Sequence, residues 1–460
     1  MRSPSAPPSL PRGEGPEGWR AALAKGAGGW LAQGRAAFMG HGELFGSVAA
    51  LSGGSISTSL LGALGGLLVA RFLGPEETGL FRVFTLPIMY LTFLQLGTFD
   101  GIGRQIPFYA GTDRQDKAEA AASVAGAWNA GVSGLASFVF LVFAFMALFR
   151  NDFIALAGWT SQAVLCWNVY YGGYLNATYR ATHQFVAMAR IQFLQAAMGF
   201  GLVFILPFTG IYGLCIRAAL PAMAGIWLYH RFRPLKVPLR LGRAALEEVV
   251  GMGLPYSFWN ALYTTVWMAT ESVLIFWLGG AGGLGLFAVA SVLREGMLIV
   301  PQAVNQAMTP RVVAAYARDG SVRLAYAGSL PFAIGLAVVM VPLVLLGSSL
   351  LPHLVPLAIP RYVDGIPIMK VCLWFSVIKA GSLPLNTLFA TGRSWPYGRG
   401  VLAGLVVFPV SACLLGPYLG GTLAVVTGSL LGRLARTLAA YAEIARMMRQ
   451  EARDAASTGK

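Results

Sequence analysis

The sequence predicts an all-α polytopic membrane protein with about twelve transmembrane helices. Of its 460 residues, 56% are hydrophobic and only 12% are charged, whereas soluble globular domains carry about 25% charged residues. The mean hydropathy is +0.64. Apolar windows of about 20 residues, long enough to cross a hydrocarbon core, recur from Val48 to Tyr441 between short turns. Most of the chain is therefore expected to lie in lipid.

The apolar windows also predict how the chain is divided. We predict helices at residues 48–70, 79–99, 124–148, 153–175, 189–207, 210–229, 253–278, 285–308, 329–348, 365–390, 397–417 and 420–441. The predicted parts are a partly disordered cytoplasmic tail (1–45), a first lobe of six helices (46–230), a cytoplasmic linker (231–252), a second lobe of six helices (253–442) and a cytoplasmic tail (443–460).

Basic residues are distributed unevenly between the two sets of loops. With a cytoplasmic N-terminus, the segments on that side hold 26 Lys and Arg residues, six of them between Arg433 and Lys460. The opposite side holds three, Arg71, Arg150 and Arg361. The positive-inside rule then predicts a multi-pass protein of a bacterial inner membrane with both termini cytoplasmic. Because the net charge of +15 follows this pattern, we expect no nucleic-acid partner.

Two pairs of segments repeat at a nearly constant spacing. Residues 72–81 match residues 277–287, and Leu175-Asn176 matches Leu385-Asn386, at offsets of about 206 to 210. With six helices in each half, both halves enter the membrane in the same direction. The sequence therefore predicts a parallel repeat, with substrate bound between the halves.

A further motif follows the first predicted helix and reads Ala70-Arg71-Phe72-Leu73-Gly74-Pro75-Glu76-Glu77-Thr78-Gly79-Leu80-Phe81. With Gly103 to Pro107, Ala177 to Ala181 and Asn386 to Arg393, it resembles the polysaccharide-transport family, the lipid-linked oligosaccharide flippases, of the multidrug, oligosaccharidyl-lipid and polysaccharide exporter superfamily. The resemblance covers about residues 46 to 445. It implies two six-helix lobes around a central cavity, lined by helices one, two, seven and eight and working by alternating access. It also implies cavity cations that hold a lipid pyrophosphate or an acidic sugar.

This resemblance leads to an expected function and expected partners. We expect a flippase that moves an anionic lipid-linked saccharide from the cytoplasmic to the outer leaflet, for cell-surface or exported polysaccharide. Its partners would be the lipid bilayer, this substrate and the polysaccharide synthesis machinery. No cofactor is expected; a coupling ion, H⁺ or Na⁺, stays open.

Five cations lie inside the predicted helices: Arg82, Arg217, Arg294, Lys370 and Lys379. An ionisable side chain in hydrocarbon costs about 2.5–3.5 kcal/mol on insertion scales, so each is a candidate for function. Arg294 and Lys379 rank first as contacts for a substrate phosphate or sugar acid, and Arg217 and Arg82 are further substrate-binding candidates. For Arg82 and Lys370, a side chain that reaches the membrane interface is an open alternative.

Glu271 lies deep in the seventh predicted helix, across the Gly-rich turn 279–284 from Arg294. The two side chains are predicted to pair. Two interpretations stay open. The pair is static and neutralises both charges, or it is a gating or ion-coupling pair in which an anionic substrate, H⁺ or Na⁺ competes for one partner.

Other chemistries find little support in the sequence. The four cysteines stand singly in apolar windows, the four histidines are dispersed, and the GxGxxG at Gly280 follows no strand. We therefore predict no catalytic residue and no metal site. A cation-coupled exporter of small organic molecules is the main alternative and would need an acid-rich cavity. A membrane-embedded glycosyltransferase or polymerase would need acidic residues and commonly a large outer loop, and the predicted outer loops are short.

Overall fold

The computed structural model describes residues 42–110, 114–182, 184–391 and 394–457. Within these ranges the chain forms helices and no strand. Of these, residues 42–51 belong to one compact unit, and the described residues from Ser52 onward belong to another. The predicted N-terminal tail (1–45) lies almost wholly outside the described residues.

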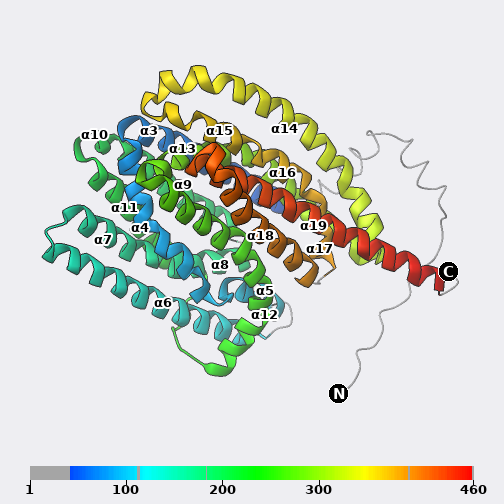
Figure 1. The fold of residues 1–460 in the computed structure, drawn as a ribbon. Helices are drawn as coiled ribbons and strands as arrows, with labels where there is room; N and C mark the ends of the chain where they lie inside the picture. Colours follow the sequence, from blue (N-terminus) through cyan, green and yellow to red (C-terminus); the bar gives the residue numbers. More distant parts are fainter. Residues whose placement is uncertain (1–41, 111–113, 183, 392–393, 458–460) are drawn as a thin grey trace. The chain divides into compact units, whose positions relative to one another are not determined.

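The helices of the first predicted lobe follow the expected order (Figure 1). They are α3 (Gly42–Phe72), α4 (Pro75–Leu91), η1 (Thr92–Gln95), α5 (Thr98–Ala110), α6 (Gln115–Phe149), α7 (Phe153–Trp167), η2 (Asn168–Gly172), α8 (Gly173–Ala181), α9 (Phe185–Gly201), η3 (Leu202–Ile205), α10 (Leu206–Thr209) and α11 (Ile211–Arg231). Each of the six predicted apolar windows corresponds to one helix or to a run of consecutive helical segments.

The second predicted lobe is built in the same manner. Its elements are α12 (Arg243–Ala261), η4 (Leu262–Val266), α13 (Trp267–Asp319), α14 (Val322–Ala358), η5 (Pro360–Gly365), α15 (Ile366–Leu373), α16 (Phe375–Gly381), η6 (Leu383–Leu385), α17 (Asn386–Ala390), α18 (Ser394–Leu419) and α19 (Gly421–Ser457). In Figure 1, α18 and α19 run side by side, as do α6 and α7.

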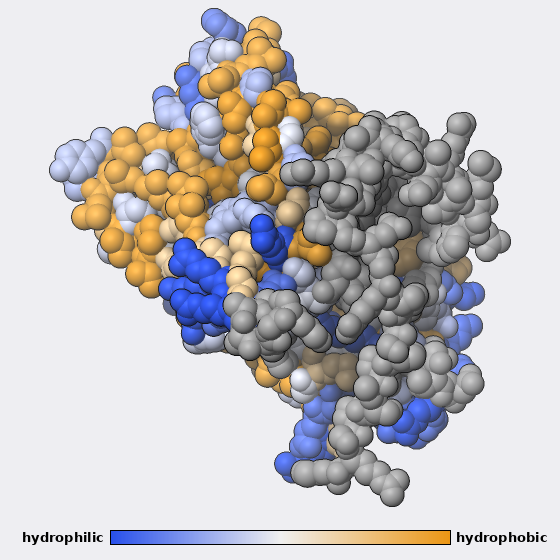
Figure 2. All heavy atoms as spheres, turned by 90° about the vertical axis from the view of Figure 1, so that its right-hand side faces the viewer, coloured by the Kyte–Doolittle hydropathy of each residue, from blue (hydrophilic) through white to orange (hydrophobic). Residues whose placement is uncertain are grey.

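Length and hydropathy confirm a multi-pass membrane protein. Among the described residues, seven helical stretches are long and apolar enough to cross a membrane, and α4 with α5 adds one bent stretch. The stretch 257–305 contains two predicted crossings, because α13 turns at Gly280. Large apolar side chains are exposed on α6 and α14, for example Phe138 and Val338. Figure 2 shows such hydrophobic surface with hydrophilic patches among it.

Several predicted helix boundaries differ from the structure, and two of them differ for local reasons. The second helix begins at Pro75, not at residue 79, since Pro75 occupies the first helical turn and Glu77 Oε2 accepts a hydrogen bond from the Gly74 amide at 3.2 Å. The predicted turn 279–284 shrinks to Gly280, whose φ of 64° favours glycine. Residues 281–284, predicted as part of that turn, are helical.

The internal repeat is visible where α4 meets α13. Gly79 packs so closely on Ala281 that a Cβ atom on Gly79 would lie 1.7 Å from the Ala281 carbonyl oxygen. The reciprocal contact joins Gly285 to Pro75, at 1.8 Å between a Cβ on Gly285 and the Pro75 oxygen. Gly285 and Ala281 follow Gly79 and Pro75 by the predicted offset of about 206. The two contacts are therefore equivalent under the repeat, and we call this region the α4/α13 end.

Side chains reinforce the α4/α13 end. The Thr78 hydroxyl lies 3.1 Å from the Tyr362 hydroxyl, and Tyr362 donates to the Leu73 carbonyl at 3.3 Å. Arg71 donates to the Ala358 carbonyl at 2.9 Å. These bonds join the turn before α4 to the turn after α14, which the basic-residue pattern predicts to be on the outer side.

The halves also meet at a second place, between α5 and α12, which we call the α5/α12 end. A Cβ atom on Gly253 would lie 2.1 Å from the Gly97 carbonyl oxygen. Ser257 donates a hydrogen bond to Asp100, and Tyr109 donates one to Glu248. That bond raises the pKa of Tyr109 above its ordinary value.

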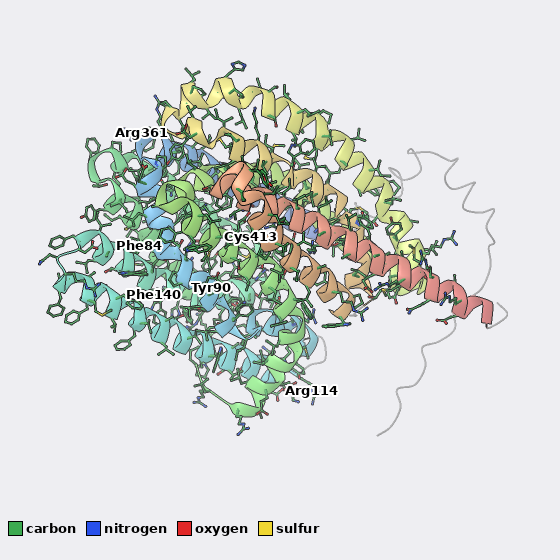
Figure 3. All side chains as sticks on the ribbon, in the orientation of Figure 1. Phe84, Tyr90, Arg114, Phe140, Arg361 and Cys413 are labelled. Carbon is green, nitrogen blue, oxygen red and sulfur yellow. The ribbon has the colours of Figure 1, made fainter. Side chains whose placement is uncertain are left out.

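The orientation that the charge pattern predicts can be tested directly with reporter fusions. Figure 3 places Arg361 and Arg114 at opposite ends of the helices, as the charge pattern requires. Reporter fusions after Glu119, Lys236 and Arg393 are expected to be cytoplasmic. A periplasmic reporter signal at any of the three positions would contradict the predicted orientation.

Candidate functional site

A cavity of about 410 Å³ lies between α3, α4, α11 and α13. These helices come from both predicted lobes. The cavity is lined by Gly66, Val69, Ala70, Thr78, Phe81, Arg82, Thr85, Leu86, Met89, Leu214, Arg217, Met268, Glu271, Ser272, Phe287, Ala288, Val289 and Val292. Three of the five residues predicted for substrate binding or coupling, Arg82, Arg217 and Glu271, thus meet in one place. We call it the central cavity.

Arg82 crosses from α4 to α13. Its guanidinium donates to the Ser291 hydroxyl at 2.6 Å, and it lies 5.6 Å from the ring centre of Phe287. Ser291 in turn donates to the Ala288 carbonyl at 2.7 Å. The alternative of a side chain that reaches the membrane interface is wrong for Arg82, because its contacts direct it into the cavity between the lobes.

Arg217 enters the same cavity from α11. Its Nε donates to the Gly199 carbonyl on α9 at 2.9 Å. Its terminal nitrogen passes over Gly65 of α3, at 3.0 Å from where a Cβ atom on that glycine would lie. A small residue at position 65 therefore leaves room for the guanidinium.

The predicted pair of Glu271 and Arg294 is confirmed as an ion pair. Arg294 donates to Glu271 Oε2 at 3.3 Å, and both side chains are buried, with 3% and 0% exposed. Arg294 also lies 3.5 Å from Glu295, which is 55% exposed. The second oxygen of Glu271, Oε1, is buried and has no hydrogen-bond partner among the described residues. That oxygen is open to a proton or a cation, while Oε2 holds Arg294.

The central cavity carries an excess of positive charge. Two cations, Arg82 and Arg217, line it together with one carboxylate, Glu271, which pairs with Arg294. Within the described ranges, neither Arg82 nor Arg217 forms an ion pair. Two guanidinium groups in a low-dielectric space therefore have only neutral partners, an arrangement that favours an anionic ligand.

Arg294, Lys370 and Lys379 are not among the residues that line the central cavity. Lys370 belongs to α15 and Lys379 to α16. Lys379 interacts electrostatically with Tyr263, Arg433 and Arg436 instead. The expectation that Arg294 and Lys379 flank one bound group is therefore not supported by their positions.

Arg433 and Arg436, which the sequence pattern counts among the cytoplasmic basic residues, have partly or fully buried side chains. Both belong to α19, which runs without a break to Ser457, and Arg436 is 7% exposed. Their contacts are rings of the second lobe, so they are interior groups. The signal that could have found them is that residues 433 and 436 fall inside the apolar window 420–441.

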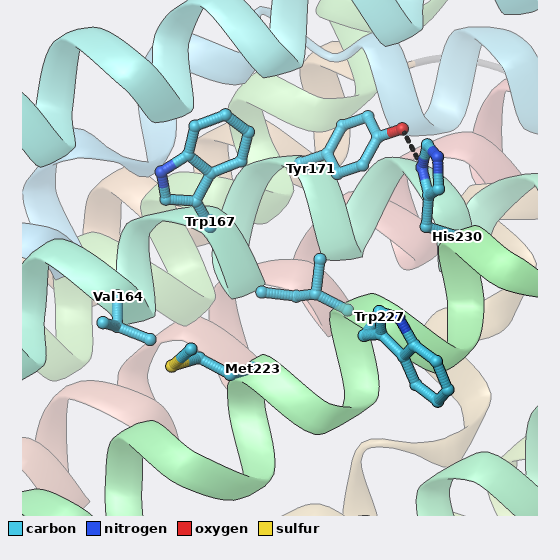
Figure 4. A pocket seen from close by; sticks show the side chains of 7 residues that line it. Val164, Trp167, Tyr171, Met223, Trp227 and His230 are labelled. Atoms are coloured by element: carbon cyan, nitrogen blue, oxygen red, sulfur yellow. Dashed lines mark hydrogen bonds between the residues drawn. The ribbon is translucent and has the colours of Figure 1, made fainter.

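A second pocket, of about 420 Å³, opens between α7 and α11 (Figure 4). It is lined by Val164, Trp167, Tyr171, Met223, Ile226, Trp227 and His230. Its polar contact is a 2.7 Å hydrogen bond between Tyr171 and His230. Because Trp227 is 64% exposed and no Arg or Lys lines the pocket, it does not compete with the central cavity as an anion site.

Metal chemistry has no cluster of ligands in the described part of the chain. No group of three or more His, Cys, Asp or Glu side chains there could hold a metal ion. Cys166, Cys215, Cys372 and Cys413 are free thiols.

The arrangement of helices is that of a known class of transporters. The chain resembles an inward-facing multidrug resistance MATE family transporter of the MOP superfamily, with a TM-score of 0.70 and 16% identity over 85% of this chain and 95% of the other. An outward-facing structure of such a transporter gives a TM-score of 0.59 over 88% and 96%. A MOP superfamily transporter from Pyrococcus furiosus gives 0.62 over 88% and 95%.

These likenesses establish the fold. At 16% identity, they support the twelve-helix, two-repeat architecture, and they do not identify the substrate. No protein-family model matches the sequence. No curated protein matches it in sequence.

Removing one partner of the Glu271–Arg294 pair is expected to destabilise the protein more than removing both. Glu271→Gln or Arg294→Gln alone leaves a buried charge without its partner, which costs about 3–5 kcal/mol. The double variant leaves two neutral amides and is expected to recover most of that loss. Thermal unfolding of all four proteins measures the coupling. Additive effects of the two single changes would contradict a buried pair.

Proposed function

We propose that the protein translocates an anionic amphiphile, a lipid-linked saccharide, across the membrane by alternating access. The observation that carries the proposal is the central cavity, in which Arg82 and Arg217 form no ion pair with a described carboxylate and Glu271 is already engaged by Arg294. A phosphate or carboxylate would satisfy these guanidinium groups with charge-assisted hydrogen bonds. The saccharide follows from the sequence resemblance.

The fold supports the alternating-access part of the proposal. Related architectures have been solved in inward-facing and outward-facing conformations. In this chain, close contacts join the halves on both sides of the cavity, Gly79 with Ala281 at one end and Gly97 with Gly253 at the other. Opening one end while the other stays closed would expose the same cations to each side in turn.

A cation-coupled exporter of small organic molecules is the second candidate. Two observations favour it: the multidrug MATE transporters share the fold, and Oε1 of Glu271 is buried with no hydrogen-bond partner among the residues that the structure describes. The polarity of the cavity argues against a cationic substrate. A transporter of this fold from Pyrococcus furiosus is described as having a binding pocket of reverse polarity that suggests a different function. Pocket polarity is therefore the property that separates the two candidates.

The proposal can be tested in cells. Deleting the gene is expected to make one lipid-linked glycan accumulate in the cytoplasmic leaflet, and wild-type protein should reverse this. The readout is mass spectrometry of extracted lipids together with labelling of glycans exposed outside. Unchanged lipid-linked glycans, together with new sensitivity to cationic drugs, would instead favour the exporter.

A further inference from the structure

Arginine and aromatic side chains alternate from the central cavity into the second lobe. Arg82 and Arg294 lie over the Phe287 ring at 5.6 and 5.5 Å. Arg294 also lies 5.2 Å from the Phe375 ring, whose centre is 5.3 Å from Arg433. Phe375 therefore stands between Arg294, the ion-pair partner of the cavity residue Glu271, and Arg433 of α19.

Beyond Phe375 lies a group that we call the α19 cluster. It consists of Tyr263, Lys379, Tyr397, Arg433 and Arg436, and it joins η4, α16, α18 and α19. Arg436 stacks 3.7 Å from the ring centre of Tyr263 and lies 5.2 Å from that of Tyr397. Arg433 donates to the Tyr263 hydroxyl at 3.3 Å.

The α19 cluster holds three cations and no carboxylate. In the part of the chain that the structure describes, Lys379, Arg433 and Arg436 form no ion pair. The nearest buried acid of α19, Glu443, is taken by Arg399 at 3.4 Å and Arg446 at 2.7 Å. The Nε atoms of Arg433 and Arg436 are buried and have no hydrogen-bond partner within the described ranges. Aromatic faces compensate part of this charge but do not satisfy these N–H groups.

We propose that the α19 cluster is a second anion-binding site, which takes the phosphate- or carboxylate-bearing head of the substrate and exchanges it with the central cavity past Phe375. The inference rests on the proposed function, because it assigns both sites to one substrate. Tyr263, Lys379 and Arg433 are only partly buried, so an anion can reach them, whereas Arg436 forms the buried floor. Guanidinium and hydroxyl donors suit a phosphate or a carboxylate.

The test measures the local preference for anions without any transport. Lys379→Cys is made in a Cys413→Ser background, since Cys413 is the exposed native thiol. The purified protein, in phosphatidylcholine nanodiscs, is labelled with an anionic or a cationic methanethiosulfonate. The quantity compared is the ratio of the anionic to the cationic labelling rate. We expect this ratio to be about tenfold higher at position 379 than at Ser349→Cys, an exposed position on α14. Inorganic pyrophosphate and farnesyl diphosphate should both slow labelling by the anionic reagent.

The double change Arg433→Gln and Arg436→Gln, in the same background, is expected to lower the ratio of anionic to cationic labelling rates at position 379 to the ratio at position 349. Equal ratios at positions 379 and 349 before that change, or no reaction at 379 with either reagent, would overturn the proposal. The proposal would also be overturned if phosphatidylglycerol in the nanodiscs slowed labelling at position 379 and the two diphosphates did not. The cluster would then be a contact for membrane lipid. If Arg82 variants keep full transport, the proposed function fails, and the labelling result still decides whether the cluster binds anions.

Discussion

Arg82→Gln is expected to reduce transport by about 10- to 100-fold while leaving the protein folded and inserted. The change removes a charged donor worth about 1.5–3 kcal/mol in a hydrogen bond to an anion. Glutamine keeps a donor for Ser291, which Arg82 now contacts at 2.6 Å. The measurement is the initial rate of substrate appearance in the outer leaflet, at matched protein levels.

Arg243→Gln is the matched control for Arg82. Arg243 pairs with Glu247 at 2.8 Å, but its side chain is 93% exposed, so neutralising it should leave transport unchanged. Wild-type transport by Arg82→Gln would contradict a substrate-binding role. Equal losses in both variants would point to an effect of net charge.

Replacing Gly79 or Gly285 with alanine is expected to open the α4/α13 end and stop transport. The added methyl group would meet a backbone carbonyl at 1.7 or 1.8 Å, and a carbonyl moves only with its helix. Because both helices contribute a lining wall of the cavity, separating them prevents closure at this end. The variants should remain inserted but lose most of their activity.

Solvent access at Thr78 reports this opening. Thr78 is 8% exposed and lies beside Tyr362. A cysteine introduced by Thr78→Cys alone should therefore react slowly with a thiol reagent, and it should react clearly faster when Gly285→Ala is added. Gly335→Ala on α14 is the control, since a Cβ atom there meets nothing within 4 Å. Unchanged access and activity in Gly285→Ala would contradict the expectation that the added methyl group opens the α4/α13 end.

Helix order and the central pair could be predicted from the sequence because each depends on local or additive properties. Apolar length predicts a crossing wherever it lies, and Glu271 and Arg294 were placed together by their position on either side of one turn. Gly79 and Gly285 fall at equivalent positions in the repeat. Their mutual contact was not predictable from either segment alone, since it depends on how the two halves pack.

The α19 cluster could not be predicted from the sequence. Arg433 and Arg436 lie near the end of an apolar window, where arginine usually reaches the interface. Whether such a residue faces headgroups or an interior ring depends on the rotation of its helix. Tyr263 and Tyr397, far apart in the sequence, supply those rings. Lys379 likewise interacts with Tyr263 and does not line the central cavity.

The most direct test of the anionic-substrate account is transport by the purified protein in liposomes. A fluorescent polyprenyl diphosphate sugar is compared with an analogue of equal chain length that carries a quaternary ammonium head. The account predicts that the diphosphate sugar crosses rapidly, that the cationic analogue does not, and that Arg82→Gln abolishes the difference. Faster movement of the cationic analogue, or equal movement of both through wild-type protein, would contradict it.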